Sequence, residues 1–222
     1  MFNFKKGSAH LEIIISFTVF LSFTIFLLYY LAPVETVNLS DNVLQTFRSS
    51  FLDYVSVEVP TLFVKSNESG CVDVDVSDFD FSSGVVARTA YGVILDSKIN
   101  SNIVSVNSAD KGFYISSSDE LNSGTYSCSS PKNYSLGDLR NEVFLSNKSL
   151  KELENNYTEN YNALKSVLGL PSAVEFAIIS DGYISAEKSV PASVESYSDE
   201  IRANVLYSNG TIRKEVFIIK IW

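Results

Sequence analysis

Histidine is nearly absent from this chain of 222 residues, in which His10 is the only one. Most general-base mechanisms use a histidine to accept a proton, and His10 stands beside a long apolar stretch rather than in a polar loop. The chain also lacks a Gly-X-Ser-X-Gly motif, a phosphate-binding loop, a dinucleotide fingerprint and a zinc-type spacing of Cys and His. We therefore predict no enzyme activity, no cofactor and no metal site.

Positive charge is scarce as well. The chain has 17 Lys and Arg against 26 Asp and Glu, a net charge of -9 and a sequence pI near 4.6. Proteins that bind nucleic acid use clustered Lys and Arg to displace counterions from phosphates, so a nucleic-acid partner is not expected. Charged residues make up 19% and hydrophobic residues 45%, a composition too apolar for a disordered chain. We expect a single folded head domain.

Cysteine occurs only twice, as Cys71 and Cys128. In an oxidising exterior the two are expected to form one disulfide that fastens a Ser-rich loop to a strand. The alternative is a pair of buried free thiols in a reducing compartment. Their wide separation excludes the Cys-X-X-Cys spacing of a redox-active pair.

Uncharged residues, in contrast, fill the twenty positions from Ile13 to Ala32. At about 1.5 Å of helix rise per residue, this length matches the roughly 30 Å hydrocarbon core of a bilayer, so a transmembrane helix is predicted. Tyr29 and Tyr30 suit the headgroup layer at its far end, whereas Lys5 and Lys6 keep the near end in the cytoplasm.

Three regions follow from this pattern. They are a basic leader over residues 1–7, a hydrophobic helix over 8–33 and an extracellular head over 34–222. The expected location is the cell surface, with insertion in the cytoplasmic membrane, the head outside, and possible later release into an extracellular filament.

Three kinds of export segment compete for this N-terminal region: a cleaved secretory signal, a permanent anchor and a pilin-type leader. A secretory signal is cut after small residues, but Tyr30-Leu31-Ala32 places a bulky Tyr where Ala is preferred. A plain anchor explains neither Gly7 directly after two lysines nor Glu12 at the edge of the apolar stretch, where a charge is costly.

The string Lys5-Lys6-Gly7-Ser8-Ala9-His10-Leu11-Glu12 resembles the class III leader of archaeal type IV pilins and archaellins, with a basic pair, a Gly at the cut and a Glu fifth in the mature chain. The resemblance covers roughly 30 residues and does not extend to the head. It implies that a prepilin peptidase cleaves between Gly7 and Ser8 and that the apolar helix stays attached to the head.

Glu12 acquires a physical role under this resemblance. Cleavage leaves an ammonium group at Ser8, which must be tolerated when the helices pack into an apolar filament core. An unpaired buried ion costs several kcal/mol, so a neighbour's Glu12 that neutralises it would fix the register between subunits. The expected partners are therefore other copies of the chain or related pilins, the membrane and the prepilin peptidase.

The fold class expected is α+β: an N-terminal hydrophobic helix, either transmembrane or in a filament core, followed by a β-rich head with one or two amphipathic helices and a C-terminal β-hairpin. Apolar spacing predicts helices at 40–55 and 149–168, the second starting with the capping box Ser149–Glu152 and ending at Gly169. Strands are predicted at 55–64, 71–79, 84–95, 103–106, 112–116 and 174–179, and a hairpin joins 201–207 to 211–222 through Ser208-Asn209-Gly210.

Six Asn-X-Ser/Thr sequons lie in the predicted exterior, at Asn38, Asn67, Asn133, Asn147, Asn156 and Asn209. They indicate N-glycosylation, although a chain rich in Asn and Ser also produces sequons by chance.

A run of Asp73, Asp75, Asp78 and Asp80 invites a calcium interpretation. The alternation of its first members with valine favours a half-buried strand instead, and the Gly of a calcium loop is missing.

The function favoured by these features is that of a structural subunit, major or minor, of an archaeal type IV pilus-like filament for adhesion, motility or secretion. The alternative is a monomeric, membrane-anchored extracellular binding protein that uses the prepilin export route without polymerising.

Overall fold

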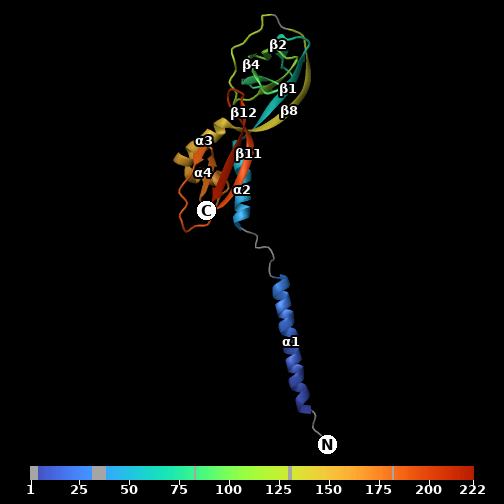
Figure 1. Cartoon of the computed structure of the whole chain (residues 1–222), viewed down its shortest axis with the longest axis vertical. Helices are drawn as coiled ribbons and strands as arrows, with labels where there is room; N and C mark the ends of the chain where they lie inside the picture. Colours follow the sequence, from blue (N-terminus) through green and yellow to red (C-terminus); the bar gives the residue numbers. More distant parts are fainter. Residues whose placement is uncertain (1–4, 32–38, 83, 130–131, 182) are drawn as a thin grey trace. The chain divides into compact units, whose positions relative to one another are not determined.

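The computed structural model describes residues 5–31, 39–82, 84–129, 132–181 and 183–222; in the first of these ranges, side chains are described for residues 12–26. The chain divides into two compact units, residues 1–42 and 43–222, each treated by itself below (Figure 1).

Helix α1 (Lys5–Leu31) belongs to the first unit. Between Ser8 and Leu31 the sequence contains neither Gly nor Pro, the two residues that most disfavour a helix interior, so nothing interrupts the hydrogen-bond ladder.

The predicted α+β class and the predicted transmembrane helix are both wrong, whereas packing of the helix in a filament core is not tested by the structure. More residues lie in strands than in helices, and a single nine-stranded sheet dominates the fold. Within the part of the chain that the structure describes, no helix combines the length and apolarity needed to cross a membrane. Non-local strand pairing, which a single sequence pattern does not reveal, accounts for the larger β content.

Helix α2 (Leu39–Val55) confirms the helix predicted over 40–55. Phe47, Phe51 and Val55 follow one another at four-residue steps and are fully buried, so they form one apolar stripe against the core of the second unit. On another face of α2, Arg48 forms an ion pair with Asp199.

The large sheet has the strand order β10-β9-β12-β11-β8-β1-β7-β3-β4. Its neighbours are antiparallel except β11 and β8, which run parallel where they meet. In chain order its strands are β1 (Ser56–Ser66), β3 (Val85–Thr89), β4 (Ile94–Leu95), β7 (Gly112–Ser117), β8 (Tyr134–Ser146), β9 (Phe176–Ser180), β10 (Ile184–Ala186), β11 (Tyr197–Leu206) and β12 (Ile212–Ile221). A second sheet has the order β2-β6-β5, with β2 (Gly70–Asp75), β5 (Ser97–Asn100) and β6 (Ile103–Ser108).

Three hydrophobic clusters hold the second unit together. In the first, α2, α3 (Asn147–Glu159) and α4 (Tyr161–Val167) pack against β9, β11 and β12, with Phe176 and Phe217 fully buried. The second cluster lies between the two sheets and includes Phe113 and Ile115. The third is smaller and joins Val86 of β3 to Leu206 of β11.

The β11–β12 hairpin confirms the predicted C-terminal hairpin. Gly210 adopts φ +83, and its N–H donates to the carbonyl of Tyr207 at 2.8 Å. A Cβ at this position would lie 2.4 Å from Cγ1 of Val86, so both the turn and the close contact with β3 require glycine.

Candidate functional site

Helix α1 exposes an apolar surface from Glu12 to Phe26. Its large apolar side chains are between 41% and 66% exposed, a degree unusual for so many neighbouring residues. They are Ile13, Ile14, Ile15, Phe17, Val19, Phe20, Leu21, Phe23, Ile25 and Phe26. Because they are spread over consecutive positions, they surround the helix instead of forming one stripe, which favours contact with apolar neighbours on several sides.

Three of the hydroxyl groups on this surface are satisfied within the helix. Thr18, Ser22 and Thr24 each donate to the carbonyl four residues earlier at 2.8 Å. These three side chains therefore need no water as a partner, and they are compatible with apolar surroundings.

The predicted processing residues Lys5, Lys6, Gly7 and Ser8 fall within the first two turns of α1, where their side chains lie outside the described residues. Glu12 is exposed on the same helix. The structure does not test cleavage or a register role, and both stay predictions.

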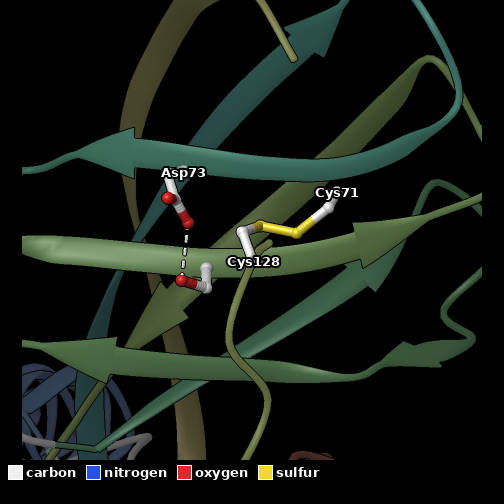
Figure 2. Close-up of a disulfide and its surroundings, with 4 residues drawn as sticks. Cys71, Asp73 and Cys128 are labelled. Carbon is white, nitrogen blue, oxygen red and sulfur yellow. Dashed lines mark hydrogen bonds between the residues drawn. A yellow bond between two sulfur atoms is a disulfide. The ribbon is translucent and has the colours of Figure 1, made fainter. Parts of the chain in front are cut away.

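The disulfide between Cys71 and Cys128 is confirmed, with the two Cα atoms 5.6 Å apart. Figure 2 shows the bond joining β2 to the loop that precedes β8, beside Asp73, whose carboxylate accepts a hydrogen bond from Ser105 at 2.6 Å. The N–H of Lys132 also donates to the carbonyl of Cys71 at 2.9 Å. The loop is thus fastened to the small sheet at two nearby points.

Removing this disulfide is expected to lower the free energy of unfolding of the second unit by about 2–4 kcal/mol, because the bond closes a long loop in the unfolded chain. The double variant Cys71→Ser/Cys128→Ser avoids a stray thiol. Urea unfolding followed by circular dichroism measures the effect, and an unchanged midpoint would contradict it. Ser127→Ala, next to the bond in an exposed position, serves as the neutral control.

The first half of the aspartate run, Asp73 and Asp75, lies in strand β2, which ends at Asp75 and is shorter than the strand predicted over 71–79. Asp78 follows in a turn, and Asp80 lies just after that turn. Val72, Val74 and Val76 are buried, while Asp75 is exposed and accepts from the N–H of Ser77 at 2.9 Å. Among the described residues, no group of three or more His, Cys, Asp or Glu is arranged to hold a metal ion.

Three sequon asparagines, Asn67, Asn133 and Asn209, are exposed. Asn147 accepts from the hydroxyl of Tyr183 at 2.6 Å and Asn156 donates to that of Tyr54 at 3.3 Å, so both amides are engaged in the fold. Asn38 lies outside the described residues.

A charged cluster that sequence analysis did not identify lies where α4 meets β9. The buried Lys165 donates to Glu175 at 3.1 Å and to the carbonyl of Ser172 at 2.8 Å. The hydroxyl of Tyr161 donates to Glu175 at 2.6 Å, and the ammonium of Lys188 lies 3.2 Å from the centre of the Tyr161 ring. Sequence spacing gave no signal for this cluster, since Glu175 and Lys188 lie outside α4, which carries Tyr161 and Lys165.

Electrostatics in this cluster follow from those contacts. The hydrogen bond from Tyr161, followed by those from Lys165 and Lys188, lowers the pKa of Glu175, although partial burial opposes the shift. Burial, and then the bond to Glu175, raises the pKa of Tyr161. Burial likewise raises the pKa of Tyr157 to about 12. Both tyrosines therefore stay protonated at neutral pH, and the cluster joins α4 to β9 through groups that satisfy one another.

Glu175→Gln is expected to lower the free energy of unfolding of the second unit by about 1–2 kcal/mol, because the buried Lys165 loses its charged partner. The loss stays this small because Glu175 is partly exposed to solvent. A lowered pKa means that the stabilisation is complete above the unfolded value of about 4.3 and is lost as the pH falls through the folded value. The difference from wild type in urea unfolding should therefore be large at pH 6–7 and shrink towards about pH 3. Glu187→Gln, at a looser and more exposed ion pair, is the control; a pH-independent difference would contradict the assignment.

A groove of about 660 Å³ lies near the disulfide loop and is lined by backbone and small polar residues together with Val86, Leu95, Tyr126 and Asn209. Among the described residues that line it, Asp96 and Tyr126 are the titratable ones. Comparison with protein-family models, with curated proteins and with solved structures finds no match to this chain.

Proposed function

We propose that this chain is a structural subunit of a surface filament resembling archaeal type IV pili, in which α1 packs against α1 helices of other copies. The observation that carries the proposal is the apolar surface of α1, whose side chains from Ile13 to Phe26 are exposed on consecutive positions. Packing such helices together would remove this surface from water and gain about 25 cal/mol of free energy for each Å² of apolar area buried. The gain increases with each copy that joins the assembly.

The leader sequence supports the same proposal. Gly7 after two lysines, with Glu12 as the fifth residue of the mature chain, resembles the class III leader of archaeal pilins. The disulfide is compatible with an oxidising exterior, where such bonds persist.

N-terminal sequencing of the surface protein, combined with electron microscopy of the cells and of shed material, tests the proposal. We expect the mature chain to begin at Ser8 and to be found in filaments. An N-terminus at Met1 or Pro33 would overturn the pilin-type processing. A start at Ser8 without filaments would overturn assembly and leave the monomeric binding protein as the function.

N-glycosylation of the head follows if the chain is exported. We expect modification at Asn67, Asn133 and Asn209, whose side chains are exposed, ahead of Asn147 and Asn156, whose amides bond to tyrosines. Intact-mass measurement before and after deglycosylation, followed by peptide mapping, checks both occupancy and order. An unshifted mass, or occupancy mainly at Asn147 and Asn156, would contradict this.

A further inference from the structure

One flank of strand β8 is open. Its other flank pairs with β1 along most of its length, but β11 meets β8 only at Leu145 and Ser146. Over residues 134–144, no other described strand pairs with β8, and Figure 1 shows this strand at the outer edge of its half of the unit. Every residue from Ser135 to Asn141 is exposed. An edge of this kind is a template for a strand from another molecule.

The direction of the backbone groups on β8 follows from β1. The N–H of Ser66 donates to Lys111, on the β7 side, at 2.8 Å, and the N–H of Asn67 donates to Asn133, on the β8 side, at 3.2 Å. The N–H and C=O groups of successive strand residues alternate between the two flanks of the strand. In β1, the N–H and C=O groups of even-numbered residues therefore point away from β8. Pro60, which lacks an N–H, is one of them.

Asn141 is the residue of β8 that lies opposite Pro60. Since Pro60 points its backbone away from β8, the two form a non-hydrogen-bonded pair, and the N–H and C=O of Asn141 therefore point to the open flank. The same alternation directs the backbone groups of Leu139 and Val143 outward. Three residues thus present donors and acceptors along one edge.

We propose that two copies of this chain pair antiparallel through β8, with Asn141 opposite Asn141 of the second copy. The twofold symmetry of this pairing places Leu139 opposite Val143 of the other copy and Arg140 opposite its Glu142, each combination occurring twice. About six backbone hydrogen bonds result, two for each of three residue pairs.

Side chains on both faces of β8 favour this register. On one face, Leu139 and Val143, which are 46% and 61% exposed, gain an apolar partner. On the other face, Arg140 already bonds to Glu142 of its own chain at 2.6 Å, so the pairing brings two ion pairs together into a ring of alternating charge. These charges disfavour a generic strand and favour a second copy, which gives the edge specificity.

The length of the paired segment is limited by an irregularity in β8. Its register with β1 shifts between the partners of Leu62 and Val64, that is, around Gly137 and Asp138. In the proposed pairing these residues lie near Leu145 of the other copy, where β11 already pairs with β8. A bulge there interrupts the regular backbone ladder, so the paired segment ends at this point.

A contact this short is expected to be weak for a single pair, since stable interfaces bury on the order of 1,000 Å² or more. Repetition along two filaments would multiply it, so the pairing provides a means of bundling filaments side by side. The pairing does not depend on the filament proposal, because purified full-length chain in detergent should form it whether or not it polymerises.

Disulfide trapping of full-length Asn141→Cys in detergent tests the pairing. Opposed residues in a hydrogen-bonded pair have Cα atoms about 5.5 Å apart, within disulfide range. Under mild oxidation we expect a covalent dimer on non-reducing gels. Asn204→Cys, at an asparagine that is also exposed but lies on β11, is the matched control and should remain monomeric. A dimer yield from Asn141→Cys no higher than that of Asn204→Cys would overturn the proposal.

A charge swap tests the register. Adding Arg140→Glu to Asn141→Cys places like charges opposite one another and should reduce the dimer yield at least several-fold. Adding Glu142→Arg as well restores opposite charges across the pair and should restore the yield. A covalent dimer yield that is the same in all three variants would overturn the proposed register between the two β8 strands.

Discussion

Replacing Phe176 by alanine is expected to lower the free energy of unfolding of the second unit by about 4 kcal/mol. Phe176 is fully buried in β9, and its ring makes edge contacts with Phe47 and Tyr157 and stacks on Tyr161, each at 5.2 Å between ring centres. Truncation removes the transfer energy of the ring, leaves a cavity among three other aromatic rings and loses their mutual orientation.

The backbone at Phe176 adds to this effect. Its carbonyl accepts from the hydroxyl of Tyr157 at 2.8 Å, and its N–H donates to the hydroxyl of Tyr161 at 3.3 Å. Collapse of the helices into the cavity would move α3 and α4 and strain both bonds, so relaxation cannot recover much of the lost energy.

Urea unfolding of the full chain, followed by circular dichroism, measures the loss. Phe176→Leu keeps much of the volume and should cost about 1–2 kcal/mol. Val167→Ala, at a side chain 61% exposed on α4, should cost under about 0.5 kcal/mol. A loss for Phe176→Ala comparable to that of Val167→Ala would show that the first cluster does not stabilise the unit.

Local patterns in the sequence identified the elements whose signals are short-range. The Ser208-Asn209-Gly210 turn requires a positive φ and small residues, so the β11–β12 hairpin was predictable from a few residues. The same holds for α2, with its four-residue apolar spacing, and for the alternating valines of β2. The disulfide was predicted from an even cysteine count together with the expectation that the head is exported.

Strand β8 was missed because its residues carry no local strand pattern. Gly137, Asp138, Arg140 and Asn141 interrupt any alternation, and the segment is a strand because β1 pairs with it along most of its length. The prediction of a single helix over 149–168 was wrong for a similar reason. It divides at Asn160, whose φ of -133 lies outside the helical range, and its cap is Ser146, which accepts from the N–H of Ser149 at 3.0 Å.

The candidate surfaces also divide into one that local sequence predicts and two that depend on the tertiary fold. The exposed apolar surface of α1 follows directly from an uninterrupted apolar sequence. The Lys165–Glu175 cluster and the open flank of β8 depend on tertiary placement, since the first joins α4 to β9 and the second exists only because β11 diverges from β8. No pattern within a single element encodes either of them.

Glu12→Ala is expected to abolish filament formation while leaving cleavage after Gly7 intact. Under the proposed function, cleavage produces an ammonium group at Ser8, and packing of α1 helices carries it into surroundings formed by the exposed apolar side chains of residues 13–26. An ammonium without a carboxylate in such surroundings costs several kcal/mol per subunit, and this cost recurs at every step of polymer growth.

Electron microscopy of the variant cells, with N-terminal sequencing of the accumulated protein, measures both parts of this expectation. Glu12→Asp keeps the charge on a shorter side chain and should retain some filaments, whereas Ser16→Ala, one turn further along α1, should leave them normal. Normal filaments from Glu12→Ala would contradict a role in assembly. Uncleaved protein would place Glu12 in recognition by the peptidase instead. The ammonium group forms only when the leader is cleaved. If Glu12 acts in assembly, the Glu12→Ala protein should therefore accumulate as mature chains that begin at Ser8 but do not form filaments.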